Sequence, residues 1–120
     1  MLYRNGLGTV AVAACLVVQL FTASDADSQS AAEKASTTCQ NCHGPGGDSA
    51  VATFPRLNGQ QRDYIAAQLK SFRDHTRSDP HAVAYMWGMA SQLDDAMIDA
   101  LAKYFAAQPP TPPCQWAGRG

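Results

Sequence analysis

The apolar residues of this chain recur with helical spacing, and no segment alternates apolar and polar residues for long enough to indicate a strand. One helix is predicted after residues 58–59, where the apolar positions follow the four-then-three spacing of a single helical face: Ile65, Leu69 and Phe72. Another is predicted from near Asp94 to the proline pair at 109–110, which a helix cannot pass. Its apolar face carries Met97, Ile98, Leu101, Tyr104 and Phe105.

A further helix is predicted on the N-terminal side of these two. Ser30 and Glu33 have the spacing of a capping box, in which the two side chains satisfy backbone N–H groups at a helix start. We expect a short helix that begins there and runs into Cys39. The chain is therefore predicted to be all-α, with about three main helices joined by loops.

Residues 1–26 have the composition of an export signal. Arg4 precedes an apolar stretch over residues 7–23, and Ser24 and Ala26 place small residues where a signal peptidase recognises them. We expect cleavage after residue 26, which leaves a domain over residues 27–108 and a Pro-rich tail over residues 109–120. Two alternatives stay open: an uncleaved membrane anchor, for which the apolar stretch is short, and a lipoprotein cleavage box that ends at Cys15.

The charge balance excludes two classes of partner. The chain has 120 residues, with 9 Lys and Arg against 10 Asp and Glu, so its formal net charge is −1. Nucleic acids and anionic membrane surfaces bind proteins with a clear cationic excess. We therefore expect no nucleic acid partner, and no membrane span once the signal has been cleaved.

The cysteines supply the candidate chemistry. With the signal removed, the chain keeps Cys39, Cys42 and Cys114, an odd number that a purely disulfide framework does not explain. Residues 39–43 (CQNCH) form the Cys-x-x-Cys-His signature of covalent c-type haem attachment. The two thiols add across the haem vinyl groups, and the adjacent His43 imidazole lies beneath the iron.

Two other uses of this motif stay open. A thioredoxin-like redox pair would need a βαβ setting, which the pattern does not indicate. A zinc site would need a further ligand, for which His75 and His81 are available.

A small helical domain buries only a modest core, and such domains commonly use a metal or cofactor to complete it. The faces of a haem would contact apolar side chains of the predicted helices and of the preceding loop: Phe54, Leu57, Ile65, Leu69 and Leu101. We therefore expect the haem to be part of the fold and the haem-free chain to be poorly ordered.

Four motifs follow one another along the chain. They are CQNCHG at 39–44, FPRLNGQ at 54–60, MWGMA at 86–90, and LDD at 93–95 leading into LAKYF at 101–105. Together they span nearly all of residues 30–108 and resemble a small bacterial class I cytochrome c, in particular one haem domain of the dihaem periplasmic cytochromes. The resemblance implies a small all-α class I cytochrome c fold wrapped around one covalently attached haem c. This chain has a single haem motif where the dihaem relatives have two.

The resemblance also implies the second iron ligand. In the family's Met-x-Gly motif, followed by an apolar residue, the first Met is the ligand; here that residue is Met86, in the loop before the last helix, with Met89 as the fallback. It further implies that the Pro55 carbonyl accepts a hydrogen bond from His43 and fixes its ring. The remaining candidates are interpreted as core packing or as solvated loop side chains: Met97, His75 and His81.

Ligation by His43 and Met86 leaves the iron without an open coordination site. We therefore expect a periplasmic monohaem carrier of single electrons in a respiratory chain, and no enzyme. Its partners would be a donor dehydrogenase or quinol-oxidising complex and a terminal oxidase or reductase. A haem subunit held in a larger oxidoreductase complex is the alternative, and a gas-binding or peroxidatic haem protein is a third hypothesis.

Two surface features allow more than one interpretation. Residues 56–77 are net basic and the aspartates within residues 79–99 follow as an acidic stretch, which indicates either a dipole that orients docking or ordinary solvated helix faces. The prolines of residues 109–113 predict either a stiff spacer or a frayed terminus. A spacer would present Cys114 and Trp116 away from the domain, where Cys114 would contact a partner or a second copy of the chain.

Overall fold

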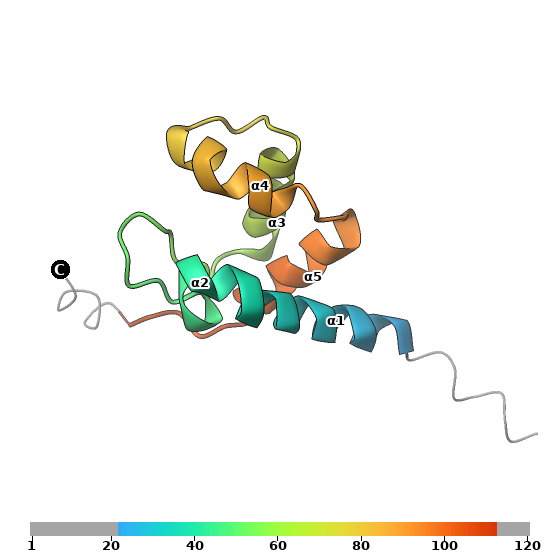
Figure 1. Ribbon diagram of the computed structural model, residues 1–120. Helices are drawn as coiled ribbons and strands as arrows, with labels where there is room; N and C mark the ends of the chain where they lie inside the picture. Colours follow the sequence, from blue (N-terminus) through green and yellow to red (C-terminus); the bar gives the residue numbers. More distant parts are fainter. Residues whose placement is uncertain (1–21, 113–120) are drawn as a thin grey trace, which may run out of the picture.

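The computed structural model of the protein describes residues 22–112, in which helices joined by loops are found and no strand, so the all-α prediction is confirmed (Figure 1). In chain order the elements are α1 (Thr22–Lys34), η1 (Ala35–Cys39), α2 (Gln40–His43), η2 (Pro45–Gly47), α3 (Arg62–Arg73), η3 (Ala82–Met86), α4 (Trp87–Ala90) and α5 (Asp95–Ala106). Within residues 22–112 no helix is both long and apolar enough to cross a bilayer.

The first helix is a continuous rod made of α1, the π-helical turn η1 and α2 (Figure 1). It begins at Thr22, so the prediction that it starts at Ser30 was wrong, and Ser30 lies inside α1. No glycine or proline interrupts residues 22–29, and the helix is held by packing on α5, which a capping pattern does not report. The predicted cleavage point after residue 26 lies within α1, and residues 1–21 lie outside the described residues.

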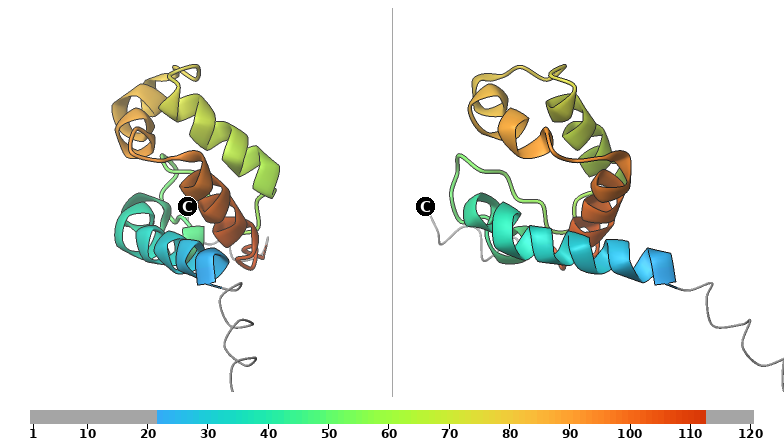
Figure 2. Two further views of the ribbon diagram at one scale, coloured as in Figure 1. Left: turned by 90° about the vertical axis from the view of Figure 1, so that its right-hand side faces the viewer. Right: turned by 45° about the vertical axis from the view of Figure 1, so that its right-hand side comes forward.

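The two longer predicted helices are confirmed as α3 and α5. The Asp94 side chain caps α5, because its Oδ1 accepts a hydrogen bond from the Met97 backbone N–H at 2.7 Å. The helix ends at Ala106, shortly before the proline pair. Figure 2 shows α3 and α5 side by side, with the first helix crossing the end of α5.

A further helix lies where the sequence analysis placed a loop. Residues 80–90 are helical throughout, as Pro80 and His81 lead into η3 and α4. The Oδ1 of Asp79 accepts a hydrogen bond from the Ala82 N–H at 3.0 Å, and proline occupies the first helical position. The loop assignment of His81, Met86 and Met89 was therefore wrong, and the Asp-Pro pair was the signal that it overlooked.

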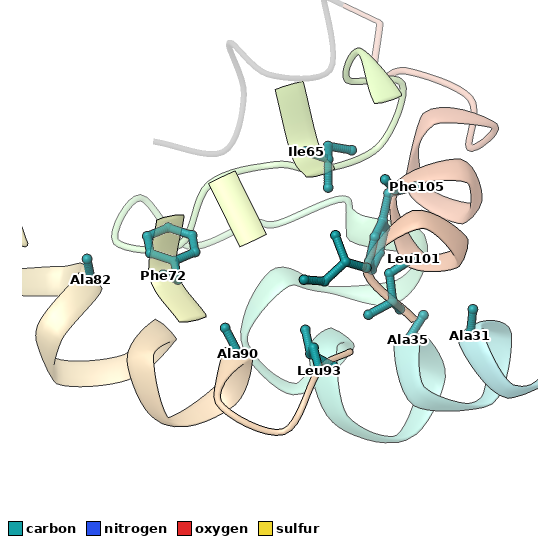
Figure 3. Packing of buried hydrophobic residues seen from close by; sticks show 11 residues of the cluster. Ala31, Ala35, Ile65, Phe72, Ala82, Ala90, Leu93, Leu101 and Phe105 are labelled. Carbon is teal, nitrogen blue, oxygen red and sulfur yellow. The ribbon is translucent and has the colours of Figure 1, made fainter. Parts of the chain in front are cut away.

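The core lies where the first helix, α3, the 80–90 helix and α5 meet. Figure 3 shows the alanines of the first helix directed toward Leu101 and Phe105 of α5. Small side chains at these positions let the two helices approach closely, and Ala31 is fully buried. The other buried apolar residues are Ala35, Ile65, Phe72, Ala82, Ala90, Leu93, Ile98, Leu101, Ala102 and Phe105.

Ion pairs join α3 to α5. Arg62 pairs with Asp99, Arg73 pairs with Asp95 at 2.8 Å, and Lys70 lies 3.9 Å from the same Asp95 carboxylate. The two remaining cations of residues 56–77 also have aspartate partners: Arg56 with Asp48 at 3.1 Å, and Arg77 with Asp79 at 2.8 Å. Four of the five cations thus pair with aspartates of residues 79–99, which favours the interpretation of these stretches as paired helix faces over that of a dipole.

The first residues of the Pro-rich tail lie against the domain. The Asn58 side-chain amide donates hydrogen bonds to the Pro109 carbonyl and to the Thr111 Oγ1, each at 2.9 Å. The prediction of a projecting spacer is therefore wrong for residues 109–112, because polar side chains of the loop before α3 hold this segment. Cys114 and Trp116 lie outside the described residues.

Candidate functional site

The Cys-x-x-Cys-His signature lies at the C-terminal end of the first helix. Cys39 is the last residue of η1, and Cys42 and His43 lie in α2. Cys39 is half-buried and Cys42 is exposed, and neither forms a disulfide. Burial raises the pKa of the Cys39 thiol, while the nearby Lys34 ammonium acts in the opposite direction.

The imidazole of His43 is buried and has a fixed orientation. Its Nδ1 lies 2.7 Å from the carbonyl oxygen of Pro55. Because a carbonyl oxygen only accepts, Nδ1 carries the proton, and Nε2 keeps the lone pair that a metal ion requires. The edge of the Phe54 ring packs on the imidazole, with 6.2 Å between the ring centroids.

A sharp turn directly after His43 makes this contact possible. Gly44 has φ +76°, and a Cβ at this position would lie 2.4 Å from the Asp48 carbonyl oxygen. Only glycine fits such a close approach in a left-handed conformation. The turn brings the chain back, so that the Pro55 carbonyl reaches His43.

The signature residues line a mostly apolar cavity of about 280 Å³. Met86 and Met89 of the 80–90 helix line the same cavity, and Figure 1 shows α2 and α4 as well-separated segments of the fold. The five apolar residues that the sequence analysis expected to face a haem all line it: Phe54, Leu57, Ile65, Leu69 and Leu101. A flat apolar group held by two thiols and an imidazole suits these walls, so the residues present fit a covalent haem.

The candidates for a second iron ligand separate by position. Met86 is partly buried and packs against the core, whereas Met89 is 55% exposed. His81 is exposed and also lines the cavity. The cavity lining does not include His75, which stacks on Trp87 with 4.0 Å between ring centroids, or Met97.

The cavity wall carries three cations that would offer a counter-charge to the propionates of a haem: Lys34, Arg56 and Arg77. Arg56 lines the cavity, and its Nε donates to Asp48 Oδ1 and to the Ser49 carbonyl. Trp87 is not part of the lining, and its indole N–H donates to the Arg77 carbonyl at 2.8 Å.

Sequence reasoning missed the aromatic part of this wall. Tyr85 lines the cavity, packs edge-on against Phe54 at 5.4 Å between centroids, and lies over His81. Residues 81, 85 and 89 are four positions apart, the spacing of one helical face. Had the helix start at Asp79 been recognised in the sequence, these three residues would have been assigned to one face of that helix.

The other interpretations of the signature lack their structural setting. Among residues 22–112 there is no group of three or more His, Cys, Asp or Glu side chains arranged to hold a metal ion such as zinc. The same residues contain no strand, so the βαβ unit of a thioredoxin-like site is not found in this part of the chain.

Comparison with known proteins gives a family match over most of the domain. The family model described as Cytochrome c matches residues 28–108. Cytochrome c-552 of Acidithiobacillus ferridurans is 46% identical over 86 residues, which cover 71% of this chain and 36% of the relative. Cytochrome c4 of Thiocapsa roseopersicina is 40% identical over 86 residues, 72% of this chain and 42% of the relative.

A third relative has a functional name. The thiosulfate dehydrogenase electron acceptor of Thiomonas intermedia (strain K12) is 42% identical over 81 residues, 67% of this chain and 36% of the relative. The chain thus spans 36–42% of the length of these three relatives.

Proposed function

This chain belongs to the cytochrome c family and carries covalently attached haem c, and on that premise we propose that it is a periplasmic carrier of single electrons between respiratory redox partners. The observation that supports this most is the composition of one cavity. Cys39, Cys42 and His43 line it together with Met86 and apolar side chains. This combination suits a covalent haem whose iron would be bound by two protein side chains.

In this proposal each residue has a separate task. The Cys39 and Cys42 thiols would form the two thioether links to the haem, and His43 Nε2 and Met86 Sδ would bind its iron. Bound haem supplies an iron that exchanges one electron between its ferrous and ferric states. The Pro55 carbonyl orients His43 and makes its imidazole more basic, and a thioether ligand favours the ferrous state. Met86 is preferred to Met89 because it packs against the core and is the less exposed of the two.

A filled coordination sphere favours electron transfer over catalysis. With His43 and Met86 both bound to the iron, oxygen and peroxide would find no free coordination site on it. We expect the purified protein to titrate reversibly as a one-electron couple and, when reduced, to resist carbon monoxide. Rapid binding of carbon monoxide by the wild-type protein would contradict the proposal and favour a gas-binding or peroxidatic haem.

The ligand assignment is tested by two matched variants. Oxidised haem with a methionine ligand shows a weak sulfur-to-iron charge-transfer band. We expect Met86→Ala to lose this band and to bind carbon monoxide when reduced, whereas Met89→Ala keeps the band. The opposite result, with the band lost only in Met89→Ala, would assign the ligand to Met89.

We also propose that residues 1–26 form an export leader that is removed. The composition of this segment supports the proposal. The intact mass of the protein recovered from a periplasmic fraction checks it: the expected mass is that of residues 27–120 plus one haem. A mass that includes residues 1–26 would instead indicate retention as an anchor.

A second candidate is an electron-transfer subunit of a larger oxidoreductase complex. It is favoured by the name of the Thiomonas relative, a thiosulfate dehydrogenase electron acceptor, which also supports a dehydrogenase as the electron donor of this chain. Size-exclusion chromatography of an extract at low ionic strength separates the two. A carrier elutes as a free small protein, whereas a subunit elutes together with its dehydrogenase.

A further inference from the structure

The segment after α5 is fastened to the loop that carries Pro55. Residues 109–112 lie beyond the end of the family match at residue 108, and we call them the C-terminal strap. The Asn58 amide donates to both Pro109 and Thr111 of the strap, each at 2.9 Å. Pro110 lies over Gly59, where a Cβ would be only 2.9 Å from the proline Cβ. The strap is therefore held by polar contacts and by close packing.

Thr111 connects the strap to the loop through a chain of hydrogen bonds. Its Oγ1 accepts from Asn58 and donates to Asp48 Oδ1 at 2.6 Å. The same Oδ1 accepts from Arg56 Nε at 3.1 Å, and that Nε also contacts the Ser49 carbonyl at 3.0 Å. The Arg56 guanidinium thus joins the two ends of the loop over residues 48–56. The Thr111 hydroxyl in turn holds the Asp48 carboxylate that accepts the hydrogen bond from Arg56.

Arg56 directly follows the residue that orients the imidazole. The Pro55 carbonyl accepts the hydrogen bond from His43 Nδ1 at 2.7 Å. We propose that Thr111 is a positioning residue, which acts through Asp48 and Arg56 to hold this carbonyl in place and so sets the strength of the His43–Pro55 hydrogen bond. The inference rests on the proposed role of His43 as an iron ligand.

The expected effect has a definite direction. A strong hydrogen bond from Nδ1 makes the imidazole more basic, which stabilises the ferric state and lowers the reduction potential. Loss of the Thr111 hydroxyl takes one donor from Asp48 and one acceptor from Asn58, so the loop is held less tightly and the His43–Pro55 bond weakens. The potential then rises. Valine has nearly the same shape as threonine and no charge, so Thr111→Val leaves the Coulomb field at the haem unchanged.

The test compares Thr111→Val with Thr111→Ser in the full-length haem protein. Two quantities are measured: the midpoint potential, and the hydrogen-exchange rate of the His43 Nδ1–H by NMR in the reduced, diamagnetic state. We expect Thr111→Val to have a higher potential and a several-fold faster exchange. Thr111→Ser keeps the hydroxyl and should match the wild type. Ser71→Ala, which removes an α3 hydroxyl that donates to the Ala67 carbonyl, is the control outside the network.

Wild-type values of both quantities in Thr111→Val would overturn the inference and leave the strap with a structural role only. If that variant folds poorly, Asp48→Asn serves instead, scored by exchange alone because a change of charge itself shifts the potential; unchanged exchange again overturns the inference. Failure of the proposed function would show differently, as the absence of an iron-ligated His43 signal in the wild-type protein.

Discussion

At the residue scale, the large buried side chains of α5 are of two kinds: those that line the cavity and those that pack only against other helices. Ile98 and Leu101 are both fully buried, but only Leu101 lines the cavity. Ile98 therefore reports on packing between helices, free of any contribution from the haem.

We predict that Ile98→Ala lowers the free energy of unfolding by about 2–5 kcal/mol, because it removes buried methylenes and leaves a cavity in a close-packed core. Chemical denaturation of the haem protein, followed by far-UV circular dichroism, measures this loss. Val83→Ala is the control, since Val83 is 46% exposed and its truncation should change stability by less than about 0.5 kcal/mol. A similar small effect for Ile98→Ala would show that this part of α5 is not a tight core.

The residues of the site differ in how far the sequence alone could predict them. Cys39, Cys42 and His43 are readable because covalent attachment demands one short spacing. The Pro55 contact followed only from family resemblance, since residues 43 and 55 meet through the turn at Gly44. Tyr85 carries no local signal of its role, which depends on where its helix packs.

At the element scale, the ion pairs between α3 and α5 make the stability of this helix pair depend on pH. Two hydrogen bonds lower the pKa of the Asp99 carboxyl: the larger effect comes from Arg62 and the smaller from Lys103. Arg73, by its hydrogen bond, and Lys70, by its charge, lower the pKa of Asp95. A carboxyl whose pKa is lower in the folded state stabilises the fold above its ordinary value of about 3.9. That contribution to stability is lost as the pH falls through the lowered pKa that the carboxyl has in the folded state.

We therefore predict that the free energy of unfolding rises between about pH 2 and pH 5 and that Asp99→Asn makes this rise shallower. Denaturant titrations at a series of pH values give the two slopes. Glu33→Gln, on the exposed side of α1, should keep the wild-type slope. An Asp99→Asn slope equal to that of the wild type would mean that the pair with Arg62 contributes nothing.

The elements themselves were predictable where the apolar pattern is long. Helices α3 and α5 each repeat their apolar face over three turns, and both were found at the predicted places. The 80–90 helix is nearly as long, but its apolar residues lie on both sides: Ala82 and Ala90 are buried, whereas Val83, Tyr85 and Met89 are exposed. Its start is marked by one carboxylate cap at Asp79. The first helix extends on the N-terminal side of Ser30, where α1 as a whole packs on α5, a contact between elements far apart in the sequence that a local capping pattern does not report.

At the scale of the whole molecule, the arrangement of charge predicts how it meets a redox partner. The cations of residues 56–77 are each paired with an aspartate, so they form no extended field. The exposed large hydrophobic side chains of the 80–90 helix are Val83, Tyr85 and Met89. Two of these, Tyr85 and Met89, also line the cavity.

We predict that electron self-exchange between reduced and oxidised copies changes by less than about threefold between about 10 mM and 0.15 M ionic strength, where the Debye length falls from about 30 Å to about 8 Å. Line broadening in mixtures of the two redox states measures the rate. Asp99→Lys, which breaks a pair and adds positive charge on α5, should make the rate more sensitive to salt. A change of tenfold or more in the wild type would restore the dipole hypothesis.

The cavity and the core share side chains, and this makes the haem part of the fold. Buried apolar residues of α3, η3, α5 and the turn before α5 also line the cavity: Ile65, Phe72, Ala82, Leu93, Leu101 and Phe105. Without a haem these side chains face water on one side, which removes much of the apolar burial that a domain of this size needs.

We therefore predict that Cys39→Ala/Cys42→Ala, which cannot attach haem, keeps part of its helical circular dichroism but loses the dispersion of its NMR spectrum and unfolds without a cooperative transition. Cys114→Ala is the matched control, because it removes a thiol outside the attachment signature; it should bind haem and show the dispersed spectrum of the wild type. A well-dispersed spectrum for the haem-free double variant would show that the helices pack on their own, and that the cavity is a site formed before the cofactor is attached.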